Sequence, residues 1–122
     1  MSARILVIED NPENLELMLY LLRASGYHVS SARDGVEGLA AVQGNRPDLI
    51  ICDVHMPCMD GFGVIARLKN DAELRTIPVI AVTALAMVGD ADRVLNAGFD
   101  GYLSKPIDPE LVVDLVKKYL GG

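Results

Sequence analysis

Acidic side chains stand directly after two apolar runs of the sequence. Glu9 and Asp10 follow the run 5–8, and Asp53 follows the run 48–52. Carboxylates that lie close together repel one another, and a divalent cation with oxygen ligands, such as Mg²⁺, relieves that repulsion. An aspartate in such a site can act as a nucleophile and form an acyl phosphate. These residues are therefore typical of a site where Mg²⁺ assists the transfer of a phosphoryl group to an aspartate.

A hydroxyl and an amino group follow two later apolar runs. Thr83 comes after the run 78–82, and Lys105 lies just past the run 101–103. A lysine ammonium supplies a positive charge for one phosphoryl oxygen, and a threonine hydroxyl can donate a hydrogen bond to another. Both groups extend the same chemistry if the fold brings them to the acidic residues.

The elements that must position these residues alternate along the chain. We expect strands over 5–8, 27–32, 48–52, 78–82 and 101–103, because these runs are apolar or rich in β-branched residues. Amphipathic patterns and capping residues predict helices over 12–26, 34–44, 62–70, 87–97 and 108–120, the fourth weakened by an interior Gly89. This alternation predicts an α/β fold with a parallel sheet covered by helices on both faces. Ligands of such sheets bind beyond the carboxyl ends of the strands, where the acidic residues fall.

Length and charge exclude several classes of protein. The chain has 122 residues and a net charge of −6, which favours one compact domain over 1–122 and argues against binding to nucleic acid or an anionic membrane. No apolar run is long enough to span a bilayer, and the first residues lack the layout of a signal peptide, so we expect a cytoplasmic protein. The two cysteines are expected to be reduced thiols.

Five segments, in order and in spacing, resemble the receiver domains of two-component signalling proteins. They are Ile8-Glu9-Asp10-Asn11, Asp48 to Asp53, Met56-Pro57 with Met59-Asp60-Gly61, Val82-Thr83-Ala84 and Leu103-Ser104-Lys105-Pro106. The resemblance covers essentially the whole chain. It implies a flavodoxin-like (βα)5 doubly wound parallel sheet with strand order 2-1-3-4-5.

The resemblance also implies a role for each residue of the acidic edge. Asp53 corresponds to the phosphoacceptor, and Glu9 and Asp10 correspond to the acidic pair that places Mg²⁺ together with Asp53. The backbone carbonyl of His55 would complete the protein ligands of the metal. Mg²⁺ is therefore the expected cofactor.

Three further positions match the phosphoryl-binding site and the switch of this family. Thr83 and Lys105 would contact the phosphoryl group, and Tyr102 occupies the switch-aromatic position. The implied function is a signalling switch that accepts phosphate from a histidine kinase or histidine phosphotransfer protein and then presents an altered surface, formed by the fourth helix, fifth strand and fifth helix, to a downstream protein. A monomer and a phosphorylation-dependent dimer are both compatible with the sequence, as are a stand-alone regulator and a domain of a hybrid kinase.

Other interpretations stay open at this point. Asp53 taken alone would be an ordinary turn or capping aspartate. A small phosphatase working through an aspartyl phosphate would need a general acid at position 55, which is histidine. A receiver-like module that no longer accepts phosphate conflicts with the intact acidic set. Cys52, His55 and Cys58 have a spacing that could indicate zinc, but Cys52 falls on an expected buried strand.

Overall fold

The computed structural model describes residues 3–56, 59–84 and 89–121, which form five strands and five helices in strict alternation. The strands are β1 (Arg4–Ile8), β2 (His28–Ala32), β3 (Leu49–Asp53), β4 (Val79–Thr83) and β5 (Gly101–Ser104). The helices are α1 (Pro12–Ala24), α2 (Gly35–Gly44), α3 (Gly61–Lys69), α4 (Asp90–Ala97) and α5 (Pro109–Leu120).

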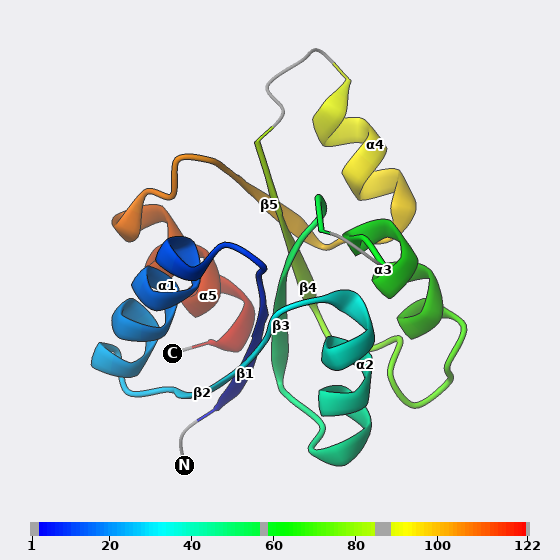
Figure 1. Ribbon diagram of the computed structural model, residues 1–122, viewed down its shortest axis with the longest axis horizontal. Coiled ribbons are helices and arrows are strands. Elements are labelled where there is room, and N and C mark those ends of the chain that lie inside the picture. The colour runs from blue at the N-terminus through cyan, green and yellow to red at the C-terminus, as the bar shows by residue number, and fades with distance from the viewer. Residues whose placement is uncertain (1–2, 57–58, 85–88, 122) are drawn as a thin grey trace.

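The strands form one parallel sheet in the order β2-β1-β3-β4-β5. Figure 1 shows α1 and α5 against one face of the sheet and α2, α3 and α4 against the other. The expected α/β class and the flavodoxin-like strand order are both confirmed. Because the order reverses between β1 and β3, the loops that leave these two strands diverge and open a crevice at their carboxyl ends.

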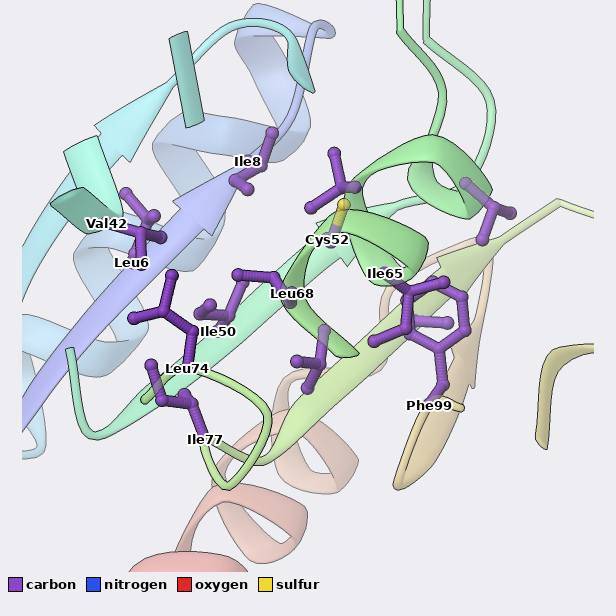
Figure 2. Close-up of a cluster of buried hydrophobic side chains, with 14 of the residues drawn as sticks. Leu6, Ile8, Val42, Ile50, Cys52, Ile65, Leu68, Leu74, Ile77 and Phe99 are labelled. Carbon is purple, nitrogen blue, oxygen red and sulfur yellow. The ribbon is translucent and has the colours of Figure 1, made fainter. Parts of the chain in front are cut away.

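Alternation along the central strands divides the interior into two cores. In β1, Leu6 and Ile8 face the α2–α4 side, while Ile5 and Val7 face the α1–α5 side, and β3 follows the same rule. Figure 2 shows the first of these cores, where side chains of the strands meet Ile65 and Leu68 of α3. Both faces of β1, β3 and β4 are therefore buried, which explains why their sequences are continuous apolar runs.

Side-chain caps begin most of the helices. Asn11, Asp34, Asp60 and Asp108 each accept a hydrogen bond from a backbone N–H in the first turn of α1, α2, α3 and α5. Such a cap stabilises a helix by about 1 kcal/mol. The expected caps at Asp34 and Asp108 are confirmed, and the caps of α1 and α5 place a proline at the first helical position.

The fourth helix is where the expected boundary was wrong. Gly89 does not interrupt α4 but is its N-cap, with a φ of 95° that a residue with a side chain would adopt only at a cost. The helix runs from Asp90 to Ala97, and residues 87 and 88 of the expected range lie outside the described part of the chain.

A close backbone approach connects β3 to α3. A Cβ atom built on Gly61 would lie 2.7 Å from the Cα of Val54 and 2.8 Å from the carbonyl oxygen of Asp53, closer than carbon packs against other atoms. Only glycine therefore lets α3 begin directly against the end of the strand that carries Asp53. Among the described residues, none of the helices has both the length and the apolar character needed to cross a bilayer.

Candidate functional site

The register of the sheet brings the carboxyl ends of β1, β3 and β4 together. Ile8 pairs with Cys52, so Glu9 and Asp53 leave neighbouring strands at the same level. Asp53 in turn pairs with Val82, the residue before Thr83. The sequence distance between these residues is large, and their proximity follows from parallel pairing.

Three carboxylates converge at this edge. Glu9, Asp10 and Asp53 each offer an oxygen, and these oxygens all lie within 4.8 Å of one another. Glu9 and Asp53 are buried, each with an exposed fraction of 1%, whereas Asp10 is exposed to solvent. The cluster is therefore open on the Asp10 side and closed beneath.

Lys105 enters the same cluster from the loop after β5. Its Nζ lies 2.8 Å from Asp53 Oδ2 and 3.7 Å from Glu9 Oε1. The other oxygen of Asp53, Oδ1, accepts a hydrogen bond of 2.9 Å from the backbone N–H of His55. Asp53 is thus held on one oxygen by the backbone and on the other by a long, mobile ammonium.

Burial and crowding change the protonation of the cluster. Desolvation by burial and the neighbouring carboxylate of Asp53 raise the pKa of Glu9 to about 8. Partial desolvation disfavours the charged form of Lys105, but the hydrogen bond to Asp53 and the carboxylates of Asp53, Glu9 and Asp10 outweigh it, so the pKa of Lys105 is raised. Below its raised pKa, Glu9 is protonated and therefore neutral. The ammonium of Lys105 then balances the negative charge of Asp53.

The donor set fits a hard divalent cation. Three carboxylates are the type of ligand that Mg²⁺ prefers, and the exposed side leaves room for the waters that it retains. Glu9 Oε1 is buried without a hydrogen-bond donor within reach, although Lys105 lies 3.7 Å away. A buried carboxylate oxygen in that condition is costly, and a bound cation would satisfy it.

The remaining predicted site residues lie around this cluster. Thr83 is buried at the end of β4 with an exposed fraction of 3%. Tyr102 is not part of the acidic cluster: it lies on β5 with 42% of its surface exposed. It shares with Lys105 and the cis-linked Pro106 the lining of an open cavity of about 450 Å³.

The cysteine–histidine spacing does not form a metal cluster in the part of the chain that is described. Cys52 is fully buried on the α2–α4 side of β3, where its thiol donates to the carbonyl oxygen of Asp53 at 3.4 Å. Desolvation raises the pKa of this thiol, which opposes the thiolate that zinc requires. Cys58 lies outside the described residues.

Two backbone donors were not anticipated from the sequence. The N–H of His55 supports Asp53, and the N–H of Asn11 donates to Glu9 Oε2 at 3.2 Å. The expected role of the His55 carbonyl as a metal ligand stays a prediction. No residue type marks such N–H donors, because their direction depends on the turn that follows each strand.

Comparison with known proteins places the site in a family. The sequence matches the response regulator receiver domain family over residues 5–117. The polar-differentiation response regulator DivK of Brucella anthropi is 44% identical over 121 residues, which cover 99% of this chain and 98% of that protein. The protein of the same name from Brucella suis is 43% identical with the same coverage.

Solved structures agree with this match. The receiver domain of a signal transduction histidine kinase from Syntrophus aciditrophicus superposes with a TM-score of 0.91 and is 39% identical, covering 99% of this chain and 92% of that one. The receiver domain of a sensor histidine kinase from Pseudomonas aeruginosa, described with a magnesium ion coordinated in its active-site cleft, has a TM-score of 0.90 and 31% identity over the full length of both chains. The chain therefore belongs to the response regulator receiver domains of two-component signalling.

Proposed function

We propose that this receiver domain accepts a phosphoryl group onto Asp53 from a phosphohistidine donor and uses the resulting charge to change its α4–β5–α5 surface. The observation that carries the proposal is the position of Lys105 Nζ, 2.8 Å from Asp53 Oδ2 at the open carboxyl edge of the sheet. An ammonium in that position stabilises both the attacking carboxylate and the phosphoryl oxygens that arrive.

Asp53 Oδ2 is the attacking atom in this proposal. Its partner is a flexible lysine that can move with a phosphoryl oxygen, whereas Oδ1 is held by the backbone of His55. An electron pair of Oδ2 forms the new bond to phosphorus as the P–N bond breaks. That bond's electron pair stays on the imidazole nitrogen, and a donor ring protonated on its other nitrogen leaves as neutral imidazole.

Glu9 and Asp10 would help to hold the cofactor without reacting, whereas Asp53 would both bind it and attack phosphorus. Glu9, Asp10 and Asp53 would bind Mg²⁺ together with the His55 carbonyl, and the bound ion would neutralise charge on the transferring phosphoryl group. Burial beneath the cluster keeps Glu9 and Asp53 in fixed positions, so little reorganisation is needed when the donor arrives.

The switch follows from charge added at the strand ends. A phosphoryl group brings about −1.5 to −2 charges and strong acceptor oxygens. The Thr83 hydroxyl then donates to it and draws the end of β4 inward, and Tyr102 turns into the space that opens. Tyr102 borders an apolar cavity of about 280 Å³ with Leu111 and Leu115 on α5, which supports this face as the one that a downstream protein recognises.

The partners and setting follow from the same proposal. The donor is a histidine kinase or histidine phosphotransfer protein in the cytoplasm, and the domain, which spans 1–122, acts on no other substrate. Its own chemistry consists of gaining and losing the phosphoryl group. Recognition of the downstream protein can occur as a monomer or as a phosphorylation-dependent dimer.

Acetyl phosphate tests the acceptor without a cognate kinase. Incubation with Mg²⁺ and acetyl phosphate is expected to add the mass of one phosphoryl group to the intact protein, and fragmentation is expected to locate it on Asp53. Asp53→Asn should abolish the gain, while Asp114→Asn, which removes the same charge from the exposed face of α5, should leave it unchanged. Phosphate at residue 53 of the asparagine variant would refute the proposal.

Two further probes, beryllofluoride and phosphate esters, separate the alternatives. A receiver-like module that no longer accepts phosphate would show no mass gain and no change with beryllofluoride and Mg²⁺. A phosphatase would instead turn over phosphate esters catalytically. The expected single, saturable modification differs from both outcomes.

A further inference from the structure

A basic cavity lies at the edge of the sheet opposite the phosphorylation site. It has a volume of about 500 Å³, and its lining includes Arg4, Arg23, Tyr27, His28 and Asn45. Arg4 and His28 begin β1 and β2, whereas Asp53 ends β3. A five-residue strand therefore separates the two sites, a rise of roughly 13 Å.

The two guanidinium groups of this cavity are anchored by neutral acceptors. Arg23 donates to the carbonyl oxygen of Val29 at 3.2 Å, and Arg4 donates to the side-chain oxygen of Asn45. Each guanidinium has five N–H donors, so several remain for a ligand after the anchoring bond is made. The anchors also reduce the side-chain entropy that binding would otherwise remove.

No carboxylate of the described residues forms an ion pair with either guanidinium. Asp48 is near, but its carboxylate accepts from the backbone N–H of Arg4 at 2.8 Å. Arg4 and Arg23 therefore line one cavity without an acidic side-chain partner, in a chain whose net charge is −6. Such a pair attracts a small anion, and its planar forks match a phosphate group.

The cavity also has an apolar wall beside the two arginines. Tyr27 is half-buried and packs against the α1–α5 core, so its ring forms a fixed wall of the cavity, and Pro47 is buried beside it. Aromatic faces stack on planar heterocycles, and Asn45 and Ser30 provide polar groups for the edges of a ring. The volume lies within the range of small-ligand sites.

We propose that this cavity binds a nucleoside monophosphate, with Arg4 and Arg23 on the phosphate and Tyr27 against the base. A molecule of this class carries both a phosphate, which matches the two guanidinium groups, and a planar base, which matches the aromatic ring of Tyr27. A polyanion such as nucleic acid is disfavoured by the negative charge of the remaining surface. Because the site lies away from Asp53, its occupancy does not depend on the phosphorylation proposed above.

Calorimetric titration of the metal-free protein, in EDTA, tests the inference without involving the carboxylate cluster. The probes are the four common ribonucleoside monophosphates, the corresponding nucleosides and inorganic phosphate. At least one monophosphate is expected to bind saturably and more tightly than both its nucleoside and inorganic phosphate. Arg23→Gln should weaken that binding by roughly tenfold or more, because a charge-assisted contact is lost. Tyr27→Leu should weaken binding of the monophosphate but leave binding of inorganic phosphate unchanged.

The matched control is Arg67→Gln, which removes the same charge from an exposed position on α3. It is expected to bind like the original protein. Circular dichroism of each variant establishes that the fold is kept, and Arg23→Lys adds a variant that retains the charge but not the planar fork. Absence of saturable binding by every monophosphate, equal affinity for inorganic phosphate, or an equal loss in Arg67→Gln would each overturn the inference.

Discussion

Lys105 and Asp53 are 52 residues apart in the sequence, yet Lys105 Nζ lies 2.8 Å from Asp53 Oδ2. This contact joins the ends of β3 and β5, which are separated in the sheet by β4. The ammonium also lies 3.7 Å from Glu9 Oε1, so one positive charge lies beside both buried acids of the cluster. Removal of the Lys105 ammonium therefore affects both the reactivity of Asp53 and the charge balance of the buried acids.

Replacement of this lysine is expected to slow phosphorylation strongly. Lys105→Met removes the charge that stabilises the transferring phosphoryl group, and loss of such a preorganised donor costs on the order of 100-fold in rate. The initial rate of phosphoryl gain from acetyl phosphate and Mg²⁺, followed by intact mass, measures the effect. Lys117→Met, at an exposed position of α5, is the control and should react at the original rate. A Lys105 variant as fast as the control would contradict the assigned role.

Magnesium binding is expected to strengthen as the pH rises towards about 8. The metal-free protein keeps a proton on Glu9 below its raised pKa of about 8, and a cation must displace that proton to use the carboxylate. The affinity should therefore increase by up to about tenfold per pH unit between about pH 6 and 8 and level off above. Calorimetry in buffers of different ionisation enthalpy should also detect release of a proton. An affinity independent of pH would refute this coupling.

Glu9→Gln is expected to stabilise the metal-free protein while weakening its Mg²⁺ affinity. A raised folded-state pKa means that the folded chain holds a proton which the unfolded chain has released, so stability falls as the pH rises from 4.5 to about 8. Glutamine removes this penalty, on the order of 1–3 kcal/mol near neutral pH. Thermal unfolding of both proteins in EDTA measures this difference in stability. Glu16→Gln, exposed on α1, is the matched control and should leave both stability and affinity unchanged.

Tyr102 is expected to become buried when the site is activated. The chain has no tryptophan, so Tyr102→Trp introduces a single fluorescent reporter at a position where the tyrosine is 42% exposed. Beryllofluoride with Mg²⁺ should reduce quenching of this reporter by iodide, because the ring turns inward. Thr83→Ala in the same background should abolish the change, and Thr83→Ser should restore it because a hydroxyl is present. Equal quenching with and without beryllofluoride would exclude the switch.

Gly61→Ala is expected to damage both stability and phosphorylation. The added methyl would lie 2.7 Å from the Cα of Val54 and 2.8 Å from the carbonyl oxygen of Asp53, and neither backbone atom can move without shifting the end of β3. Overpacking of this kind costs about 1–3 kcal/mol. Gly44→Ala, at the end of α2 where nothing lies within 4 Å, should be close to neutral. Urea unfolding and the phosphorylation rate measure the two effects.

The expected elements were mostly confirmed because their signals are local. Buried parallel strands are continuous apolar runs, and caps such as Asp34 and Asp108 are recognised by residue type and spacing. Gly89 is the exception, because the sequence pattern predicts it in the interior of α4 and the structure has it as the N-cap of that helix. A glycine is compatible with a weakened helix and with a left-handed cap, and only the backbone conformation distinguishes them.

The sequence by itself determined the alternation of strands and helices and the acidic, hydroxyl and amino groups that stand at strand ends. Parallel pairing brings such ends to one edge, so Glu9, Asp53 and Lys105 could be grouped before their distances were known. Only the tertiary structure decided that Lys105 reaches Asp53 Oδ2, that the backbone N–H of His55 donates to the other oxygen, and that burial raises the pKa of Glu9. These features depend on side-chain direction and desolvation, which arise when distant segments pack together and which no local pattern of residues encodes.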